Sequence, residues 1–253
     1  MHPNIVTFCD KNYITVGKNW LNCISKLGLR NNVKIITLDD ETRNEFDEDI
    51  SIYKPLPLGD HDLNSLWVHR MKVLFELLEN EGDLIHSDAD ALWLKNPFND
   101  IQQCNADVVF TQGTIWPPDV HLKQGFVLCC GFFYLSQNTR TFKFMNKVLS
   151  RLLIEKDDQV AVNRVVAESL QSWDIKQPYK VAFRSTHFVA SRSIISSSNL
   201  CIDGEVLKVA LLPHHKYPRL LKEILPEFVV VHPLSGKTSV EKKEIFANLG
   251  LWN

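Results

Sequence analysis

The sequence has 253 residues, of which 45% are hydrophobic and 23% are charged, and its formal net charge is −2. This length suits one large α/β domain or two small ones, and the composition is ordinary for a globular protein. Because there is no basic surplus, nucleic-acid binding is not expected as a function. No segment reaches the roughly eighteen consecutive apolar residues of a membrane span.

The cysteine usage and the N-terminus bear on the compartment. None of the six cysteines forms a Cys-x-x-Cys pair, and most lie in apolar surroundings, which favours buried free thiols in a reducing compartment. The N-terminus lacks the basic start and long apolar core of a signal peptide. We therefore expect a cytoplasmic protein, with a soluble fragment of a luminal or membrane-anchored protein as the alternative.

The first third of the chain alternates apolar segments with amphipathic ones. Gly28 and Gly82 are suited to ending the two longer helices. The elements expected in this part are a strand at 4–8, a helix at 13–27, a strand at 33–38, a short helix at 39–46, a loop at 52–62 and a helix at 66–78.

The rest of the chain continues this alternation, which predicts a mainly parallel sheet covered by helices on both faces. No repeat or linker is visible, so we expect a single domain over residues 1–253. The expected elements are strands at 83–87, 107–111, 132–136, 206–212 and 228–232, a long loop at 112–124, and helices at 139–154, 157–170 and 239–249.

Two carboxylates, Asp88 and Asp90, stand at the end of the predicted strand 83–87, inside an otherwise apolar segment. Such acids are costly to bury unless they are paired or bind a metal. Residues i and i+2 of an extended chain lie on the same side, and carboxylate oxygens suit Mg²⁺ or Mn²⁺. We expect a cation site here, with Asp90 in direct contact, because ligands bind at the carboxyl ends of strands.

Other polar residues stand at predicted strand ends or helix starts and can meet the pair at one sheet edge: Asp10, Asp158 with Gln159, and His232 with Lys237. His232 would complete an O/O/N ligand set, which suits Mn²⁺ better than Ca²⁺. Lys237 follows a glycine, as in turns that approach a phosphate. The alternatives are a helix-capping role for Asp157, a capped strand end for His232 and a solvated turn position for Lys237.

Several segments together resemble a known family. They are 4–13, 72–98, 131–136, Asp158-Gln159 and the ending His232…Gly236-Lys237…Gly250-Leu251-Trp252, and the most specific is His-Ser-Asp-Ala-Asp-Ala-Leu-Trp-Leu-Lys-Asn-Pro-Phe at 86–98. The chain resembles the nucleotide-diphospho-sugar transferases of glycosyltransferase family 77, which include the rhamnogalacturonan-II xylosyltransferases. It is also similar to the glycogenin and galactosyltransferase group of family 8.

The resemblance implies a GT-A fold, with a Rossmann-like sheet, and a UDP-sugar donor. By position, it implies that Thr7, Asp10 and Tyr13 hold the uracil and ribose. It further implies that Arg70 or Lys72 reaches the diphosphate or the carboxylates.

The same resemblance places the Asp-x-Asp pair at the nucleotide and the metal. Asp88 and Asp90 would bind Mn²⁺ (or Mg²⁺) and ribose, Ala89 would line the nucleotide-sugar site, and His232 would complete the metal site. Lys237 would neutralise the leaving diphosphate.

The resemblance also bears on the sugar. Asp158 would hold its hydroxyl groups, and Gln159 would lie near the anomeric carbon. The resemblance implies retaining transfer. Because no pair of Glu acids is placed as in glycoside hydrolases, we expect a same-face route rather than double displacement, with Asp158 as a minor candidate nucleophile. Galactose, xylose and arabinose are all compatible as the transferred sugar, and the acceptor would be a glycan or another hydroxyl compound.

Two other functions fit the same residues less well. A phosphohydrolase of the aspartyl-phosphate type also uses Asp-x-Asp after a strand, but normally on its first strand. A catalytically inert module that only binds nucleotide sugars would also retain these residues.

Overall fold

The computed structural model describes residues 2–57, 63–198, 200–234, 236 and 238–252. Strands β3, β2, β1 and β4 of its largest sheet run parallel, while β7 is antiparallel to both β4 and β6. This confirms the predicted α/β class. The strand order is β3 (Ser51–Tyr53), β2 (Val33–Thr37), β1 (Asn4–Cys9), β4 (Leu84–Ser87), β7 (Leu128–Leu135), β6 (Val108–Gln112), β14 (Val209–Leu211), β11 (Ile195–Ser198) and β8 (Ser172–Asp174).

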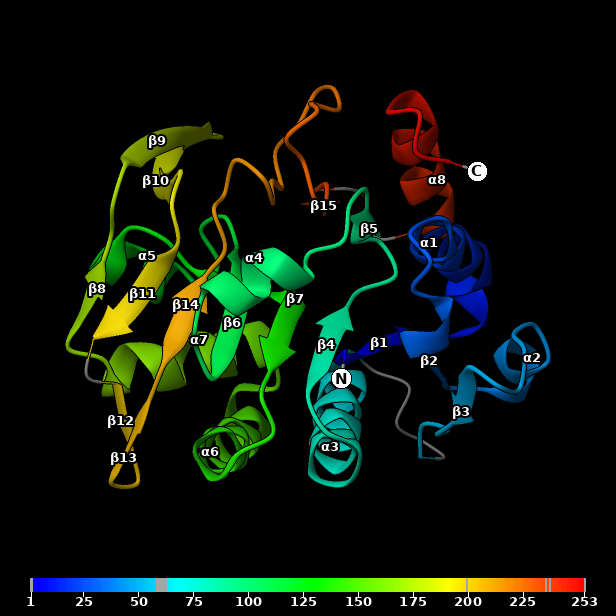
Figure 1. Ribbon diagram of the computed structural model, residues 1–253, viewed down its shortest axis with the longest axis horizontal. Helices are drawn as coiled ribbons and strands as arrows, with labels where there is room; N and C mark the ends of the chain where they lie inside the picture. The colour runs from blue at the N-terminus through cyan, green and yellow to red at the C-terminus, as the bar shows by residue number, and fades with distance from the viewer. Residues whose placement is uncertain (1, 58–62, 199, 235, 237, 253) are drawn as a thin grey trace.

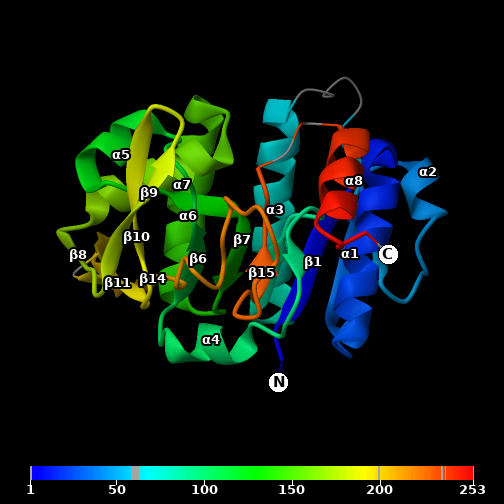
Figure 2. The same ribbon diagram turned by 90° about the horizontal axis from the view of Figure 1, so that it is seen from above.

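Helices cover both faces of this sheet, as predicted. Helices α3 (Leu63–Glu81) and α6 (Thr139–Glu155) lie on one face, and α1 (Ile14–Lys26) and α8 (Ser239–Asn248) lie on the other (Figure 1). Helix α7 (Asp158–Ser169) packs against α6. Figure 2 shows α8 beside α1, so the end of the chain lies next to its first helix.

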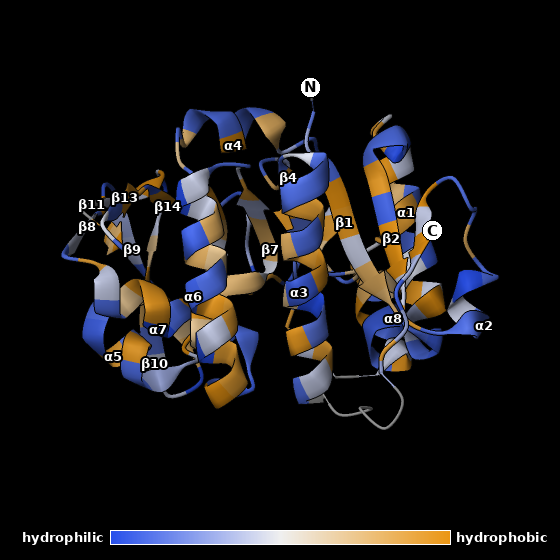
Figure 3. Cartoon of the chain, turned by 90° about the horizontal axis from the view of Figure 1, so that it is seen from below, coloured by the Kyte–Doolittle hydropathy of each residue, from blue (hydrophilic) through white to orange (hydrophobic). Residues whose placement is uncertain are grey.

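The central strands are buried on both faces because helices cover both sides, and successive side chains point to opposite sides. Ile5 and Val6 are neighbours on β1 and are both fully buried, yet Ile5 belongs to the core that contains Trp20 of α1, and Val6 to the core that contains Leu74 of α3. Figure 3 shows mostly hydrophobic residues on β1 and β2, with hydrophilic residues over much of the visible side of α3.

Shorter elements complete the described chain. They are helices α2 (Asp40–Arg43), α4 (Phe98–Gln103) and α5 (Pro118–Gln124), the 3₁₀ turns η1 (Lys11–Tyr13) and η2 (Arg30–Asn32), and the paired strands β9 (Pro178–Phe183) with β10 (Thr186–Ser191), β12 (Leu200–Ile202) with β13 (Glu205–Leu207), and β5 (Leu92–Trp93) with β15 (Val230–Val231). In the described part of the chain, no helix is long and apolar enough to cross a membrane.

The predicted helices at 13–27, 139–154 and 239–249 are confirmed to within one residue at each end. The helix expected at 39–46 ends earlier, at Arg43. The loop expected at 112–124 is wrong in its second half, which forms α5. Pro118 occupies the first turn of α5, where a proline is favoured, and Gly125 ends the helix in the left-handed conformation.

Two predicted strands are shorter than expected. The segment 206–212 is broken at Lys208, whose backbone N–H donates to the Asp107 carboxylate, so that β13 pairs with β12 while β14 joins the main sheet. The segment 228–232 forms only the short strand β15, because its partner β5 has just two residues. Residues 58–62 of the loop expected at 52–62 lie outside the described residues, and β3 takes up its start.

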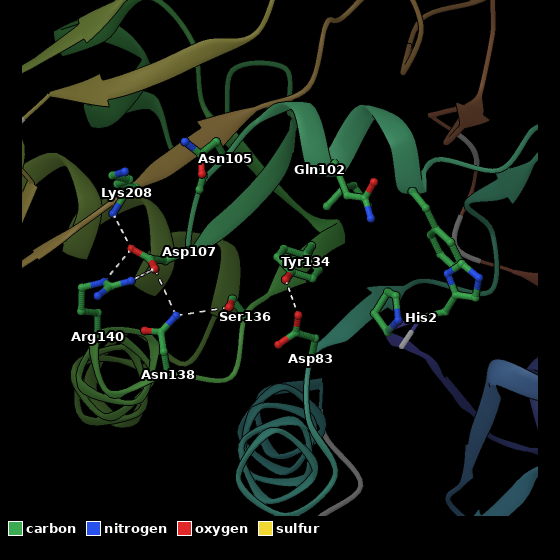
Figure 4. Close-up of a pocket in the computed structure, with 14 residues that line it drawn as sticks. His2, Asp83, Gln102, Asn105, Asp107, Tyr134, Ser136, Asn138, Arg140 and Lys208 are labelled. Carbon is green, nitrogen blue, oxygen red and sulfur yellow. Dashed lines mark hydrogen bonds and ion pairs between the residues drawn. The ribbon is translucent and has the colours of Figure 1, made fainter.

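A cavity of about 500 Å³ lies at the amino-terminal ends of the parallel strands, opposite the end at which β4 leads to Asp88. Its polar groups bond mainly to one another (Figure 4). Tyr134 donates to Asp83, and Asp107 accepts from Arg140, Asn138 and the Lys208 backbone N–H. Asp107 therefore ties α6 to β6 and β14.

We predict that Asp107→Ala lowers the free energy of unfolding by about 2–3 kcal/mol, because it removes a buried carboxylate that accepts several part-buried hydrogen bonds. Guanidinium denaturation followed by circular dichroism measures this. Asp174→Ala removes an exposed ion pair with Lys176 and should cost less than about 0.5 kcal/mol. An equal decrease in the free energy of unfolding in the two variants would contradict the conclusion that Asp107 connects α6 to β6 and β14.

Candidate active site

The first carboxylate of the pair, Asp88, follows directly after β4. Its backbone N–H donates to the carbonyl oxygen of Gly131 (2.8 Å), because the antiparallel strand β7 runs alongside. One carboxylate oxygen, Oδ1, accepts from Arg70 of α3 (2.9 Å) and lies 3.1 Å from Nε2 of the buried His86. The other oxygen, Oδ2, points to the site.

The second carboxylate, Asp90, lies in the turn between β4 and β5. Its Oδ2 accepts from Lys242 of α8, and its Oδ1 lies 3.2 Å from Nε2 of His232. The pairing of β15 with β5 sets Val231 opposite Leu92, so the next residue, His232, arrives beside the turn. The register of two very short strands thus joins residues far apart in the sequence.

Each of these three side chains is held by one atom and presents another. Asp88 presents Oδ2, Asp90 presents Oδ1 and His232 presents Nε2, with Nε2 3.9 Å from the Asp88 oxygen. Atoms of all three lie within 4.8 Å of one another. In metal sites, each ligand side chain is typically oriented by a hydrogen bond from its other polar atom to a neighbouring residue. The three side chains here have this arrangement.

A second part of the site begins at α7. Asp157 caps this helix by accepting from Val160 N–H (2.9 Å), and the next residue, buried Asp158, forms an ion pair with Arg70. The amide of Gln159 is held at both ends, with Nε2 donating to the Trp116 carbonyl (2.7 Å) and Oε1 accepting from Cys130 N–H (3.4 Å). Arg70 therefore links Asp158 to Asp88 across the site.

Gly131 lies directly under the acids and the histidine. A Cβ atom at this position would be 2.2 Å from Cε1 of His232 and 2.6 Å from Oδ2 of Asp88. Any side chain here would displace both, so the site requires glycine in strand β7.

Comparison with known families decides the class of protein. Residues 47–216, more than half of the 253, match the family model for nucleotide-diphospho-sugar transferases. The chain belongs to the nucleotide-diphospho-sugar transferase family. This confirms the resemblance to nucleotide-diphospho-sugar transferases seen in the sequence.

Solved structures similar to this transferase are themselves glycosyltransferases. The galactosyltransferase LgtC in complex with donor and acceptor sugar analogues shares 12% identity at a TM-score of 0.46, over 63% of this chain and 69% of that chain. An active-site mutant of LgtC shares 11% identity at a TM-score of 0.45, over 64% of this chain and 69% of that chain. The bifunctional glycosyltransferase WbbM, in apo form, shares 11% identity at a TM-score of 0.42, over 64% of this chain and 37% of that chain. At these values the likeness supports no detail of function. No curated protein matches the chain.

The charges of the transferase site are set by burial and pairing. Burial raises the pKa of Asp88, but Arg70 and the hydrogen bond with His86 outweigh it and lower that pKa to about 2. For Asp90, burial is again outweighed, by His232 and Lys242, and the pKa falls well below its usual value. Burial and Arg219 lower the pKa of His232, but Asp90 and Cys129 prevail and raise it to about 9.

Most residues singled out in the sequence lie near this site, some less directly than expected. Tyr13 lies beside the site, with its ring centroid 5.8 Å from Lys242 Nζ, and the pKa of its hydroxyl is raised by burial and then by Asp90 and Asp88. Asp10 ends β1 and accepts from Asn12 N–H (3.0 Å). Thr7 is fully buried, and its hydroxyl has no hydrogen-bond partner among the described residues. Ala89 is buried within the turn.

The two lysines considered for the diphosphate have different outcomes. Lys72 is exposed and lies two residues from Arg70, hence on another side of α3, where it lines a shallow hollow with His69 and Lys156. Lys237 lies outside the described residues.

Sequence reasoning missed residues that hold the site from outside the motif. In sequence, Lys242 of α8 resembles its neighbour Lys243, a surface lysine, yet it is buried against Asp90. Cys129 and Arg219 gave no signal either, although Arg219 donates to the Cys129 sulfur (2.8 Å). Burial raises the Cys129 pKa, but Arg219 and His232 outweigh it and lower that pKa to about 6.

We predict that Gly131→Ala weakens Mn²⁺ binding by at least about tenfold, because the added methyl group displaces His232 and Asp88. Isothermal titration calorimetry measures the affinity. The control is Gly17→Ala, whose methyl group meets Cys9 and Phe46 in the core and should leave the affinity unchanged. An unchanged affinity in Gly131→Ala would contradict this close approach.

We also predict that Mn²⁺ binds more tightly as the pH rises from about 6.5 toward 9. His232, with its pKa raised to about 9, must lose a proton before Nε2 can bind the metal, so affinity should rise about tenfold per pH unit. Titrations at several pH values measure the slope. The slope should flatten above pH 9 and disappear in His232→Asn, and a flat profile in the wild-type protein would contradict proton displacement.

Proposed function

We propose that this transferase is a retaining, Mn²⁺-dependent glycosyltransferase that moves a sugar from a UDP-sugar to a hydroxyl group of a glycan or similar acceptor. The observation that carries this proposal is the convergence of Oδ2 of Asp88, Oδ1 of Asp90 and Nε2 of His232. In a family that transfers nucleotide-linked sugars, such a group is suited to a divalent ion and the diphosphate bound to it.

The charge balance of the site favours an anionic ligand once a metal is bound. Without a metal, Asp88, Asp90 and Asp158 face Arg70, Lys242 and protonated His232, so the charges cancel. A divalent ion that replaces the His232 proton leaves the site with one positive charge. When bound, the ion would supply Lewis-acid stabilisation of the leaving diphosphate.

The chain's own residues keep the donor site ordered. Lys242 fixes the Asp90 carboxylate by one oxygen, and Arg70 does the same for Asp88. Because these contacts exist before the donor binds, little reorganisation is needed when charge develops on the leaving group. Tyr13, whose ring centroid lies 5.8 Å from Lys242 Nζ, is suited to cover the nucleotide.

The sugar would lie toward Asp158 and Gln159. Because Asp158 is buried in an ion pair with Arg70, its oxygens are better suited to hold sugar hydroxyl groups than to attack the anomeric carbon. The fixed Gln159 amide can face the electron-poor anomeric carbon with its oxygen. These contacts favour same-face transfer, in which a diphosphate oxygen takes the acceptor proton, over double displacement.

A radiometric or UDP-release assay with UDP-galactose, UDP-xylose and UDP-arabinose tests the proposal. We expect slow Mn²⁺-dependent UDP release with at least one donor. Asp90→Asn should reduce it at least about a hundredfold, because the isosteric amide removes a ligand charge. Asp203→Asn, in the exposed turn between β12 and β13, serves as a control and should keep full activity.

Three outcomes would count against the proposal. Full activity in excess EDTA would contradict metal dependence, and stabilisation by GDP-sugars alone in a thermal-shift screen would contradict the uridine assignment. Donor binding without turnover for every acceptor tried would favour the inert binding module. Family membership already favours transfer over the aspartyl-phosphate phosphohydrolase.

A further inference from the structure

Cys129 of β7 is fully buried, and three nitrogen atoms approach its sulfur. Arg219 Nη1 donates at 2.8 Å, the Gly131 backbone N–H donates at 3.4 Å, and Nδ1 of His232 lies 3.8 Å away. A guanidinium and a backbone amide can only donate, so the sulfur acts as an acceptor toward both. The Cys129 sulfur is therefore the acceptor at the centre of this cluster.

The sulfur and the acids contact opposite nitrogens of one imidazole ring. His232 Nδ1 faces Cys129, while Nε2 faces Asp90 at 3.2 Å and Asp88 at 3.9 Å. With Nδ1–H directed at an acceptor, Nε2 carries the lone pair that a metal needs. Cys129 itself is not suited to ligate the same ion, because it lies on the far side of the ring.

Backbone contacts bring Arg219 and His232 together independently of the sulfur. The His232 N–H donates to the Pro218 carbonyl (3.2 Å), and the Leu234 N–H donates to the Arg219 carbonyl (3.2 Å). The two segments thus run side by side over Cys129. Arg219 therefore places its positive guanidinium beside the sulfur, and the segment that carries it is fixed relative to His232.

We propose that Cys129, held by Arg219, is a positioning residue that orients His232 and sets its Nδ1–H tautomer for binding a divalent cation. A thiol sulfur takes the place that a carboxylate or a backbone carbonyl commonly occupies behind a metal-binding histidine. Cys129 thereby does for His232 what Lys242 does for Asp90 and Arg70 for Asp88. The inference rests on the metal-dependent function proposed above.

The test is the affinity for Mn²⁺ alone, measured by calorimetry on the full chain, together with the melting temperature. Cys129→Ala should weaken Mn²⁺ binding about 10- to 100-fold. Cys129→Ser keeps an acceptor with a shorter reach and should recover part of the loss. Arg219→Gln, at a partly exposed position, should also weaken Mn²⁺ binding. This variant tests the inference if Cys129→Ala fails to fold.

The matched control is Cys23→Ala, which removes a buried sulfur from α1, in the core cluster that contains Trp20. It should lower the melting temperature like Cys129→Ala but leave the Mn²⁺ affinity within twofold. Unchanged affinity in folded Cys129→Ala or in Arg219→Gln, or an equal loss in Cys23→Ala, would overturn this inference alone. Absence of Mn²⁺ binding by the wild-type protein would overturn the metal site and this inference together.

Discussion

The burial of two carboxylates at the end of β4 is the constraint on which this site depends. Asp88 and Asp90 lie where the sheet and the surrounding helices exclude most water, so their charges must be balanced locally. Arg70 comes from α3 on one face of the sheet, and Lys242 from α8 on the other. Neutralising the pair therefore joins the two helical layers and brings the end of the chain back to its middle.

Backbone geometry orients the side chains of the site. The antiparallel strand β7 places Gly131 beside Asp88, and the absence of a side chain there lets His232 approach the carboxylate. The two-residue pairing of β5 with β15 places His232, the residue after β15, beside the turn that carries Asp90. Because each side chain is bonded through one atom to another residue, its remaining atom is held facing the other two, as electrostatic preorganisation requires.

Much of the fold and the centre of the site could be predicted from the sequence. The alternation of apolar segments with amphipathic helices predicted the α/β class, and Asp-Ala-Asp after an apolar strand predicted paired acids at its carboxyl end. The strands at 206–212 and 228–232 were predicted too long, because apolar residues alone do not reveal which neighbour a segment pairs with. Lys208 breaks the first, and β5 limits the second.

The sequence by itself determined which polar residues stand at strand ends, because burial periodicity and polar interruptions are local properties. Only the tertiary structure decided that Lys242, rather than the exposed Lys72, contacts the acids, and that Cys129 and Arg219 stand behind His232. Local pattern does not distinguish a surface lysine from one that a distant carboxylate buries. That distinction depends on the free energy of pairing charges across the sheet, which arises only when segments more than a hundred residues apart meet.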